Sequence, residues 1–408
     1  MSRQTIAVTG LGALTPAGIG IEDTWRRICR GDSMAAHDEE LASSAINISC
    51  RVPEFTIADR RLARQLWRQD RSVQMALVAA GEALQNARLD PGAWDGARVG
   101  VAIGCAFGGA RNWETGITQL RQAGADAVSS ALLPTMLANM AAGEVAIAYG
   151  ARGPSLAPLT ACASGASALA VARDWLHAGY CDIVLAGGTD AAVTPLIVAG
   201  LQRLGALSSR TDQPEAASRP FAADRDGLVI GEGAAVLVLE RQVQAEARGV
   251  RARALLTGCG MSTDALHPTS PHPEGEIAER AVAAALADAD LTPRDVDHVN
   301  AHGTSTVKGD AAEASLISRM FGHGVSVTSA KGAVGHTLGA AGAVEAALTV
   351  LSIERSIVPP TANVDMLSPE FDIDLVMKSA RPQVVETAVS NSMGFGGHNV
   401  SLVFQSAG

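Results

Sequence analysis

Leu159-Thr160-Ala161-Cys162-Ala163-Ser164-Gly165-Ala166-Ser167-Ala168-Leu169 is a short apolar approach that breaks into a predicted helix of small residues. This layout places one thiol, that of Cys162, at the N-terminus of the helix. A helix N-terminus carries roughly half a positive charge and unpaired N–H groups, so it stabilises a thiolate. The stretch therefore indicates either a nucleophilic cysteine or a buried structural cysteine, which is the more common fate of a free thiol.

Short apolar runs alternate with helical stretches on both sides of this segment. Buried strands, bounded by turn signals, are predicted at residues 6–11, 99–103, 183–186 and 235–239. Helical spacing is present at residues 73–87 and 164–177. This alternation predicts an α/β protein whose strands are mostly parallel.

The chain also hints at two similar halves. Residues 7–12 and 255–260 each form an apolar run that enters a glycine turn, and helix–strand alternation restarts at residues 276–288 and 299–300. We predict an N-terminal half over residues 1–250, which holds the cysteine, and a C-terminal half over residues 251–408.

Composition limits the class of protein. The 408 residues are 47% hydrophobic and carry a net charge of −10, which argues against a nucleic-acid partner. No window of about twenty uncharged apolar residues occurs, so no membrane span is predicted. The N-terminus has no signal-peptide pattern, and the six cysteines are scattered without a CxxC pair. These features predict a cytoplasmic protein with free thiols.

Three later motifs add polar side chains to glycine-bounded loops. They are NAHGTST at residues 300–306, SAKGAVGHTLGAAG at residues 329–342 and NSMGFGGHN at residues 391–399. Loops at strand ends are where α/β folds place their sites. One loop histidine is commonly only a hydrogen-bonded residue, but His302, His336 and Lys331 together with Cys162 indicate a catalytic constellation.

In order and spacing, these motifs resemble those of the β-ketoacyl-acyl-carrier-protein synthases, the elongating condensing enzymes of fatty acid and type II polyketide synthesis. The resemblance covers essentially the whole chain, including residues 152–155 and 219–233. It implies a thiolase-like, five-layered αβαβα sandwich built from two similar halves, usually as a dimer. It also implies a decarboxylating condensation of an acyl chain with a malonyl group held on an acyl carrier protein.

Site roles follow from the resemblance, motif by motif. Cys162 resembles the nucleophile that holds the acyl chain. His302 and His336 resemble the pair that binds the malonyl thioester carbonyl and assists decarboxylation, and which histidine does which part stays open. Lys331 resembles the lysine that organises this site, with Glu313 as its expected carboxylate partner. Decarboxylation generates an enolate, so the site needs donors aimed at that oxygen, and two neutral imidazoles supply them.

Other positions match supporting roles. Phe395 matches a gate, and its backbone N–H with that of Cys162 matches an oxyanion hole. Thr304 and Thr306 match residues that bind the phosphopantetheine arm, which arrives on the carrier protein, so no covalently bound cofactor is expected. A buried monovalent-cation site seen in many relatives matches Asn300, Glu345, Ser390 and Asn391.

A few positions depart from the family pattern. Val307, Ala222 and Met393 stand where relatives usually have Pro, Asp and Phe, which leaves the subfamily open. Phe107 matches a position that lines the acyl pocket, where smaller aliphatic residues are common. The added volume favours short acyl primers, or a pocket completed by a different partner subunit.

A basic cluster is a candidate docking surface for an acidic carrier protein, although a solvated helix face fits as well. Its members are Arg60, Arg61, Arg64, Arg68 and Arg71 around Trp67.

Four other classes fit the sequence less well. A thiolase needs a second catalytic cysteine near the C-terminus, but the last cysteine is Cys259. Starter-type and chalcone-synthase-like enzymes use Cys-His-Asn, whereas the third position here is His336. A scaffold-type chain-length factor characteristically loses the nucleophile, and Cys162 is present. A metal- or nucleotide-binding protein fails on motif spacing. The pathway, and the choice between a homodimer and a heterodimer with a chain-length factor, stay open.

Overall fold

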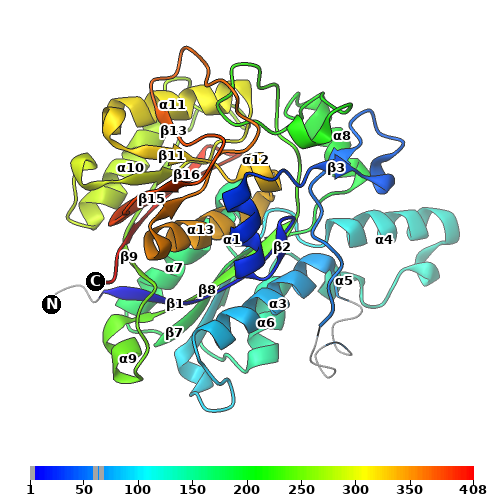
Figure 1. Cartoon of the computed structure of the whole chain (residues 1–408). Helices are drawn as coiled ribbons and strands as arrows, with labels where there is room; N and C mark the ends of the chain where they lie inside the picture. The colour runs from blue at the N-terminus through cyan, green and yellow to red at the C-terminus, as the bar shows by residue number, and fades with distance from the viewer. Residues whose placement is uncertain (1–4, 58–62, 64–68) are drawn as a thin grey trace.

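Five layers of helix and sheet stack across the molecule (Figure 1). The computed structural model describes residues 5–57, 63 and 69–408. Of the predicted basic cluster, only Arg71 falls within these ranges; the other four arginines and Trp67 lie outside the described residues.

The first sheet and its outer helices come from the N-terminal part of the chain. Its strands are β1 (Ile6–Thr15), β8 (Gly233–Arg241), β7 (Ile183–Asp190), β5 (Val99–Gly104) and β6 (Ser155–Leu156). The helices that cover its outer face are α3 (Arg71–Asn86) and α6 (Met140–Tyr149).

The second sheet and its outer helices come from the C-terminal part. Its strands are β9 (Ala254–Thr263), β16 (His398–Gln405), β15 (Thr387–Gly394), β10 (His298–Asn300), β11 (Ser326–Thr328) and β13 (Asp374–Leu375). Its outer helices are α10 (Glu276–Asp288) and α11 (Val307–Phe321).

Two buried helices form the middle layer, α7 (Ser164–His177) and α13 (Ala341–Arg355). They can lie close because small residues meet between them. A Cβ on Gly165 would lie 2.8 Å from the backbone nitrogen of Ala343, so only glycine fits there. This packing fixes the start of α7, and with it Cys162, at the centre of the molecule.

The two sheets are continuous with each other and form one mixed sheet, so the prediction of mostly parallel strands is wrong. Its strands run in the order β13-β11-β10-β15-β16-β9-β1-β8-β7-β5-β6. The pairs are parallel around β5 and β10 but antiparallel where β1 meets β8 and β9 and where β15 meets β16. Every residue of β1 is buried. Such a strand is a continuous apolar run whichever way its neighbours point, so the sequence pattern does not reveal direction.

The two sheets join edge to edge between β1 and β9, where Ile6, Ala7 and Val8 pair with Leu256, Leu255 and Ala254. The five-layered α/β arrangement predicted from the resemblance is present. The division of the chain at residue 250 stays a prediction.

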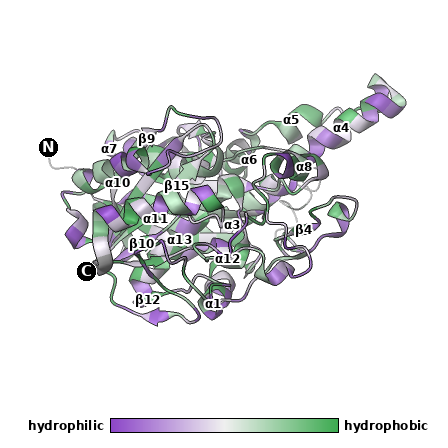
Figure 2. Ribbon diagram, turned by 90° about the horizontal axis from the view of Figure 1, so that it is seen from above, coloured by the Kyte–Doolittle hydropathy of each residue, from purple (hydrophilic) through white to green (hydrophobic). Residues whose placement is uncertain are grey.

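The remaining helices and strands lie outside these layers, except for Gly18 and Ile19, which pair with the end of β1. The helices are α1 (Ile21–Arg30), α4 (Ala110–Ala123), α5 (Leu132–Met136), α8 (Pro195–Arg203), α9 (Gln242–Ala247) and α12 (Lys331–Val334). The strands are β2 (Gly18–Ile19), β3 (Ala36–His37), β4 (Ile48–Ser49), β12 (Ile357–Val358) and β14 (Arg381–Pro382). Helices α4 and α5 project from the body (Figure 2).

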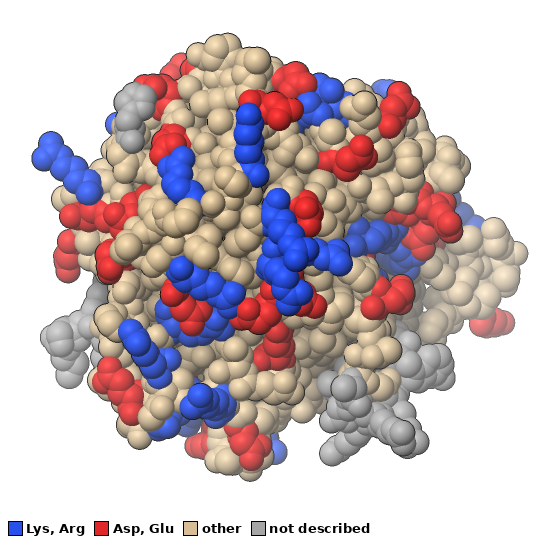
Figure 3. Space-filling view, in the orientation of Figure 1, with Lys and Arg blue, Asp and Glu red and all other residues tan. Residues whose placement is uncertain are grey.

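Across the described part of the chain, no helix combines the length and the apolar character that a membrane crossing requires. On the face shown in Figure 3, Lys and Arg side chains are interspersed with Asp and Glu, and several gather near the middle. The net negative charge therefore does not form one continuous acidic surface on this side.

Candidate active site

Cys162 lies in a 3-10 turn, Ala161–Ala163, that leads directly into α7. Ala161 has a φ of 51°, a left-handed conformation that L-residues adopt only under strain. The end of β15 passes very close to this turn, since a Cβ on Gly394 would lie 2.4 Å from the Thr160 carbonyl oxygen. The local backbone thus presents the half-buried Cys162 at the helix N-terminus that the sequence predicted.

The protonation state of Cys162 differs from the expected thiolate. Burial raises the pKa of the thiol to about 12, although Lys331 and a hydrogen bond from the Phe395 backbone N–H act in the opposite direction. Asp190 and Glu345 add negative charge nearby and raise the pKa further. The isolated site therefore holds a neutral thiol, because desolvation outweighs the helix terminus and the lysine.

His302 follows β10 and is held through its backbone. Its N–H donates to Glu313 Oε1 at 2.8 Å, and the N–H of Gly303 donates to Glu313 Oε2 at 2.7 Å. Glu313 comes from α11 and is buried. One carboxylate therefore fixes the turn that carries the imidazole. Burial lowers the pKa of His302 well below its ordinary value, and Lys331 and His336 lower it further, so the ring is neutral.

Lys331 begins α12 and is fully buried beneath His302. Its Nζ lies 2.5 Å from the His302 carbonyl oxygen and 3.3 Å from His302 Nδ1, and it forms an ion pair with Glu345 of α13. The expected pairing of Lys331 with Glu313 is therefore wrong: Glu345 is the partner, and Glu313 accepts backbone N–H groups instead. Burial raises the pKa of Glu345 to about 7, while Lys331 lowers it.

Hydrogen bonds to the two imidazoles fix their tautomers. An ammonium group only donates, so His302 Nδ1 accepts from Lys331 and the ring carries its proton on Nε2. His336 Nδ1 accepts from the Leu338 backbone N–H at 3.3 Å, which likewise leaves the proton on Nε2. Burial also lowers the pKa of His336 well below its ordinary value. The two rings lie edge to face with centroids 5.3 Å apart, so two neutral N–H donors sit side by side.

A cavity of about 650 Å³ connects these groups. Cys162, His302 and His336 all line it. Its apolar lining residues include Phe107, Leu159, Leu201, Leu204, Leu228 and Leu338. Its polar lining residues include Thr304, Thr306, Lys308 and Asn399. The cavity therefore offers both apolar surface for an acyl chain and hydrogen-bonding groups for a polar arm.

The remaining predicted contact residues also line this cavity. Thr304 Oγ1 lies 2.9 Å from Thr306 Oγ1, and Thr306 also caps the N-terminus of α11 by accepting from Gly309 N–H at 3.2 Å. Phe395 lies in a turn whose following glycines have positive φ, and the Gly396 N–H donates to the Pro268 carbonyl at 2.7 Å. The structure thus brings Phe107, Thr304, Thr306 and Phe395 to one cavity with the thiol.

Three of the four residues matched to a cation site carry a buried oxygen atom that has no hydrogen-bond partner. These oxygens are Asn300 Oδ1, Glu345 Oε2 and Ser390 Oγ. The fourth residue, Asn391, accepts from Ser401 Oγ through its Oδ1 at 2.8 Å. Asn300 and Ser390 are paired in register on adjacent strands, and Asn300 Nδ2 donates to the Glu345 carbonyl at 3.1 Å. Buried polar atoms are normally paired, so a cluster of unpaired oxygens fits a small hard cation.

One buried acid at the site, Asp190, escaped the sequence analysis. It ends β7 and accepts four hydrogen bonds from segments that line the cavity. The sequence did contain a signal: Asp190 lies four residues beyond the end of the predicted strand at 183–186, and loops at strand ends are where α/β folds place their sites.

Comparisons with known proteins agree with this site. The family model for the N-terminal domain of β-ketoacyl synthase matches residues 3–245, and the model for the C-terminal domain matches residues 253–365. The chain is 42% identical to 3-oxoacyl-[acyl-carrier-protein] synthase 2 of Vibrio harveyi and 39% identical to the protein of that name from Synechocystis sp.. Each alignment covers 99% of both chains.

Solved structures give the same result. A ketosynthase complex of a type II polyketide synthase with its acyl-carrier protein, bound to the hexaketide, superposes with a TM-score of 0.92 at 32% identity over all of both chains. The ishigamide ketosynthase/chain length factor reaches 0.93 at 30% identity, also over all of both chains. A β-ketoacyl synthase from Burkholderia phymatum reaches 0.91 at 32% identity, covering 98% of this chain and 99% of that one. These findings confirm the resemblance drawn from the motifs.

Proposed function

This chain belongs to the β-ketoacyl synthase family, and we propose that Cys162 is the nucleophile of its reaction. The protein is an acyltransferase that condenses an acyl chain with malonyl-acyl carrier protein in fatty acid or polyketide synthesis. The observation that carries the residue assignment is that Cys162 lines the same cavity as His302 and His336, whose ring centroids lie 5.3 Å apart.

In the first half-reaction Cys162 takes the acyl chain from an acyl carrier protein. The sulfur attacks the thioester carbonyl, and the bond to the phosphopantetheine sulfur breaks. The proton of the neutral thiol goes to the departing phosphopantetheine thiolate, so a high resting pKa is compatible with this exchange. The backbone N–H groups of Cys162 and Phe395 stabilise the oxyanion that forms.

In the second half-reaction the malonyl thioester loses carbon dioxide, and its carbonyl becomes an enolate oxygen. The Nε2–H groups of His302 and His336 donate to that oxygen and stabilise the charge. Their low pKa values keep both rings neutral, so neither donor is an acid that would quench the enolate. Lys331 holds His302 in the required tautomer through Nδ1. The enolate carbon then attacks the acyl carbonyl, the bond to the Cys162 sulfur breaks, and the departing thiolate takes up a proton from water.

Thr304 and Thr306 bind the phosphopantetheine arm in this proposal, and Phe395 acts as the gate between the two half-reactions. The carrier protein brings that arm, so the chain needs no covalently bound cofactor. We place the enzyme in the cytoplasm, where carrier proteins are available.

The partner subunit is proposed to cover the projecting arm formed by α4 and α5. Large apolar side chains are exposed there: Trp113, Ile117, Leu120, Leu133 and Leu137. The adjacent edge strand β6 exposes Leu156. Exposed apolar patches and free sheet edges are typical of interfaces, which favours a dimer.

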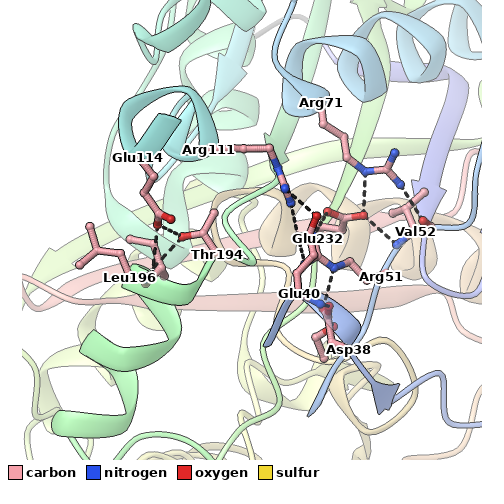
Figure 4. Close-up of polar contacts among 12 residues, drawn as sticks. Asp38, Glu40, Arg51, Val52, Arg71, Arg111, Glu114, Thr194, Leu196 and Glu232 are labelled. Atoms are coloured by element: carbon pink, nitrogen blue, oxygen red, sulfur yellow. Dashed lines mark hydrogen bonds and ion pairs between the residues drawn. The ribbon is translucent and has the colours of Figure 1, made fainter. Parts of the chain in front are cut away.

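The base of the arm is firmly attached (Figure 4). Arg111 donates to both carboxylate oxygens of Glu40 at 2.7 and 2.6 Å, and Thr194 donates to Glu114. The arm therefore presents a defined surface. The partner is a second copy or a homologous chain-length factor, and similarity to the ishigamide ketosynthase/chain length factor supports the second alternative.

An assay of the purified chain tests the proposed function. The chain is mixed with a short acyl carrier protein and malonyl-carrier protein, and carbon dioxide and β-ketoacyl-carrier product are measured. Product from this chain alone supports a self-sufficient homodimer. Product only after adding a homologous subunit supports the heterodimer. No product in either case contradicts the proposed function.

Phe107→Ala is expected to shift the acyl preference toward longer chains. The Phe107 ring lines the cavity that we propose holds the acyl chain, and its removal enlarges that pocket. A pocket change of this size alters relative rates by about tenfold or more. The measurement is the ratio of Cys162 acylation rates for long and short acyl carriers. Tyr180→Ala, which removes an exposed aromatic ring away from the cavity, should leave the ratio unchanged. An unchanged ratio in Phe107→Ala would show that this ring does not set chain length.

Potassium or sodium is expected to stabilise the fold, compared with tetramethylammonium at equal ionic strength, by binding the three buried oxygens of Asn300, Glu345 and Ser390 that have no partner. Occupancy at a hundred times Kd is worth about 2.7 kcal/mol, so the unfolding midpoint should rise by a few degrees. Ser390→Ala should reduce the rise. Ser352→Ala removes a buried hydroxyl already bonded to the Leu348 carbonyl and should keep it. Equal midpoints in both salts would exclude the site.

A further inference from the structure

Asp190 is a fully buried carboxylate that accepts four hydrogen bonds from residues in or next to the cavity lining. Its Oδ2 accepts from the backbone N–H of Ala106 at 2.9 Å and of Gly339 at 2.7 Å. Its Oδ1 accepts from the N–H of Phe107 and from the Cys105 thiol, each at 3.2 Å. One side chain therefore ties the end of β7 to two separate loops.

The first of these loops is the segment Cys105–Gly109, which follows β5. Its residues Ala106 and Phe107 line the cavity. The Cys105 sulfur also accepts from the Gly108 N–H at 3.0 Å. The Cys105 thiol therefore links Asp190 to Gly108 through two hydrogen bonds. Any loss of the carboxylate would free both Ala106 and Phe107 at their backbone nitrogens.

The second loop contains Leu338 and Gly339 and supplies a hydrogen bond to the His336 imidazole. Gly339 directly follows Leu338, whose N–H donates to His336 Nδ1. Leu338 is held at a φ of 54°, a strained conformation that its neighbours must maintain. A Cβ on Gly339 would lie 2.5 Å from Asp190 Oδ2, so the carboxylate and this turn fit together without spare room.

Neutral donors alone satisfy the carboxylate. Among the described residues, no Lys or Arg forms a salt bridge with Asp190 within 4.0 Å. Burial raises its pKa to about 6, against the hydrogen bonds that lower it. Stability alone does not favour a buried acid without a cation, since an apolar residue would avoid the desolvation cost. The arrangement suits a residue that positions others.

We infer that Asp190 is a positioning residue that holds the Phe107 wall and the Leu338 donor of His336 in register with Cys162. This inference rests on the proposed function. Through this one side chain, the choice of acyl chain at Phe107 depends on the same contacts that orient His336 for decarboxylation.

Asp190→Asn tests the inference. The amide keeps the shape but offers one acceptor oxygen, and its NH₂ group faces N–H donors. Displacement of groups by about 1 Å costs on the order of 100-fold in rate, so condensation should fall by about that factor. The ratio of acylation rates for long and short acyl carriers should also change, because Phe107 is released. Malonyl decarboxylation measured in a Cys162→Gln background should fall as well, because His336 loses its fixed donor.

Glu82→Gln is the matched control. Glu82 accepts from the backbone N–H groups of Ala13 and Ile21, both at 2.8 Å, and does not line the cavity. The Glu82→Gln variant should be less stable than the wild-type protein but should keep the wild-type ratio of acylation rates for long and short acyl carriers. If Asp190→Asn shows the wild-type ratio and the wild-type decarboxylation rate per folded molecule, the inference is overturned. Wild-type protein without condensation would instead refute the proposed function.

Discussion

Cys162→Ala is expected to abolish acyl-enzyme formation and to lower condensation by at least about a thousandfold, the scale of losing a catalytic nucleophile. The reason is that no other thiol lines the cavity in the described structure. The measurement is β-ketoacyl-carrier product per unit time, with the acyl adduct followed by intact mass. Full condensation by this variant would contradict the assignment of the nucleophile.

Two variants make the Cys162 result specific. Cys29→Ala removes another half-buried thiol, whose pKa burial raises to about 11, and should condense at the wild-type rate. Cys162→Gln should lose condensation but retain malonyl decarboxylation, since His302 and His336 remain in place. A loss of decarboxylation in this folded variant would show that the thiol also takes part in that step.

Lys331→Met is expected to remove decarboxylation and condensation and to destabilise the fold. His302 loses the donor that fixes its tautomer, and Glu345 loses its cation in a buried site. Breaking a buried ion pair from one side costs about 3–5 kcal/mol. The measurements are carbon dioxide release and the free energy of unfolding from denaturant titration.

The stability of Lys331→Met should depend on pH in a defined direction. Burial already raises the pKa of Glu345 from 4.5 to about 7 with Lys331 present, and removing the cation raises it further. The folded state then binds a proton that the unfolded state has released. The contribution of protonated Glu345 to the stability of the variant is therefore fully present below about pH 4.5, the unfolded-state pKa. It is lost as the pH rises through the folded-state pKa.

The double variant Lys331→Met/Glu345→Gln separates the two effects. Removing the carboxylate should restore much of the stability and flatten its pH dependence, because no buried charge is left unpaired. Activity should stay lost, since His302 still lacks its donor. Recovery of decarboxylation in the double variant would show that the lysine acts only through stability.

Local structure was largely predictable from the sequence. The predicted helices at 164–177 and 276–288 have the bounds observed for α7 and α10, because small-residue and apolar spacing defines both. The helix predicted at 73–87 spans Arg71–Asn86, since Asp70 caps it by accepting from Ser72 N–H at 2.9 Å. The four motifs converge on one cavity, as their places at strand ends predicted.

Long-range pairing was not predictable in the same way. Strand direction and the partner of Lys331 depend on which segments meet in space, and Glu313 and Glu345 both follow glycine-containing motifs. In the structure α13 packs against β15, and its Glu345, rather than Glu313, forms the ion pair with the lysine. The raised pKa of Cys162 could not be predicted for a related reason. The sequence shows the helix terminus that lowers this pKa, but the burial that raises it depends on the tertiary structure.

The most direct test of the central claim is a peptide map of the acylated enzyme. Purified chain is incubated with a short acyl carrier protein, digested, and searched for the mass of the acyl group. The account predicts one acylated peptide, modified at Cys162, and loss of the adduct when malonyl-carrier protein is added and β-ketoacyl product appears. An acyl group on another residue, or an adduct that malonyl-carrier protein does not discharge, would contradict it.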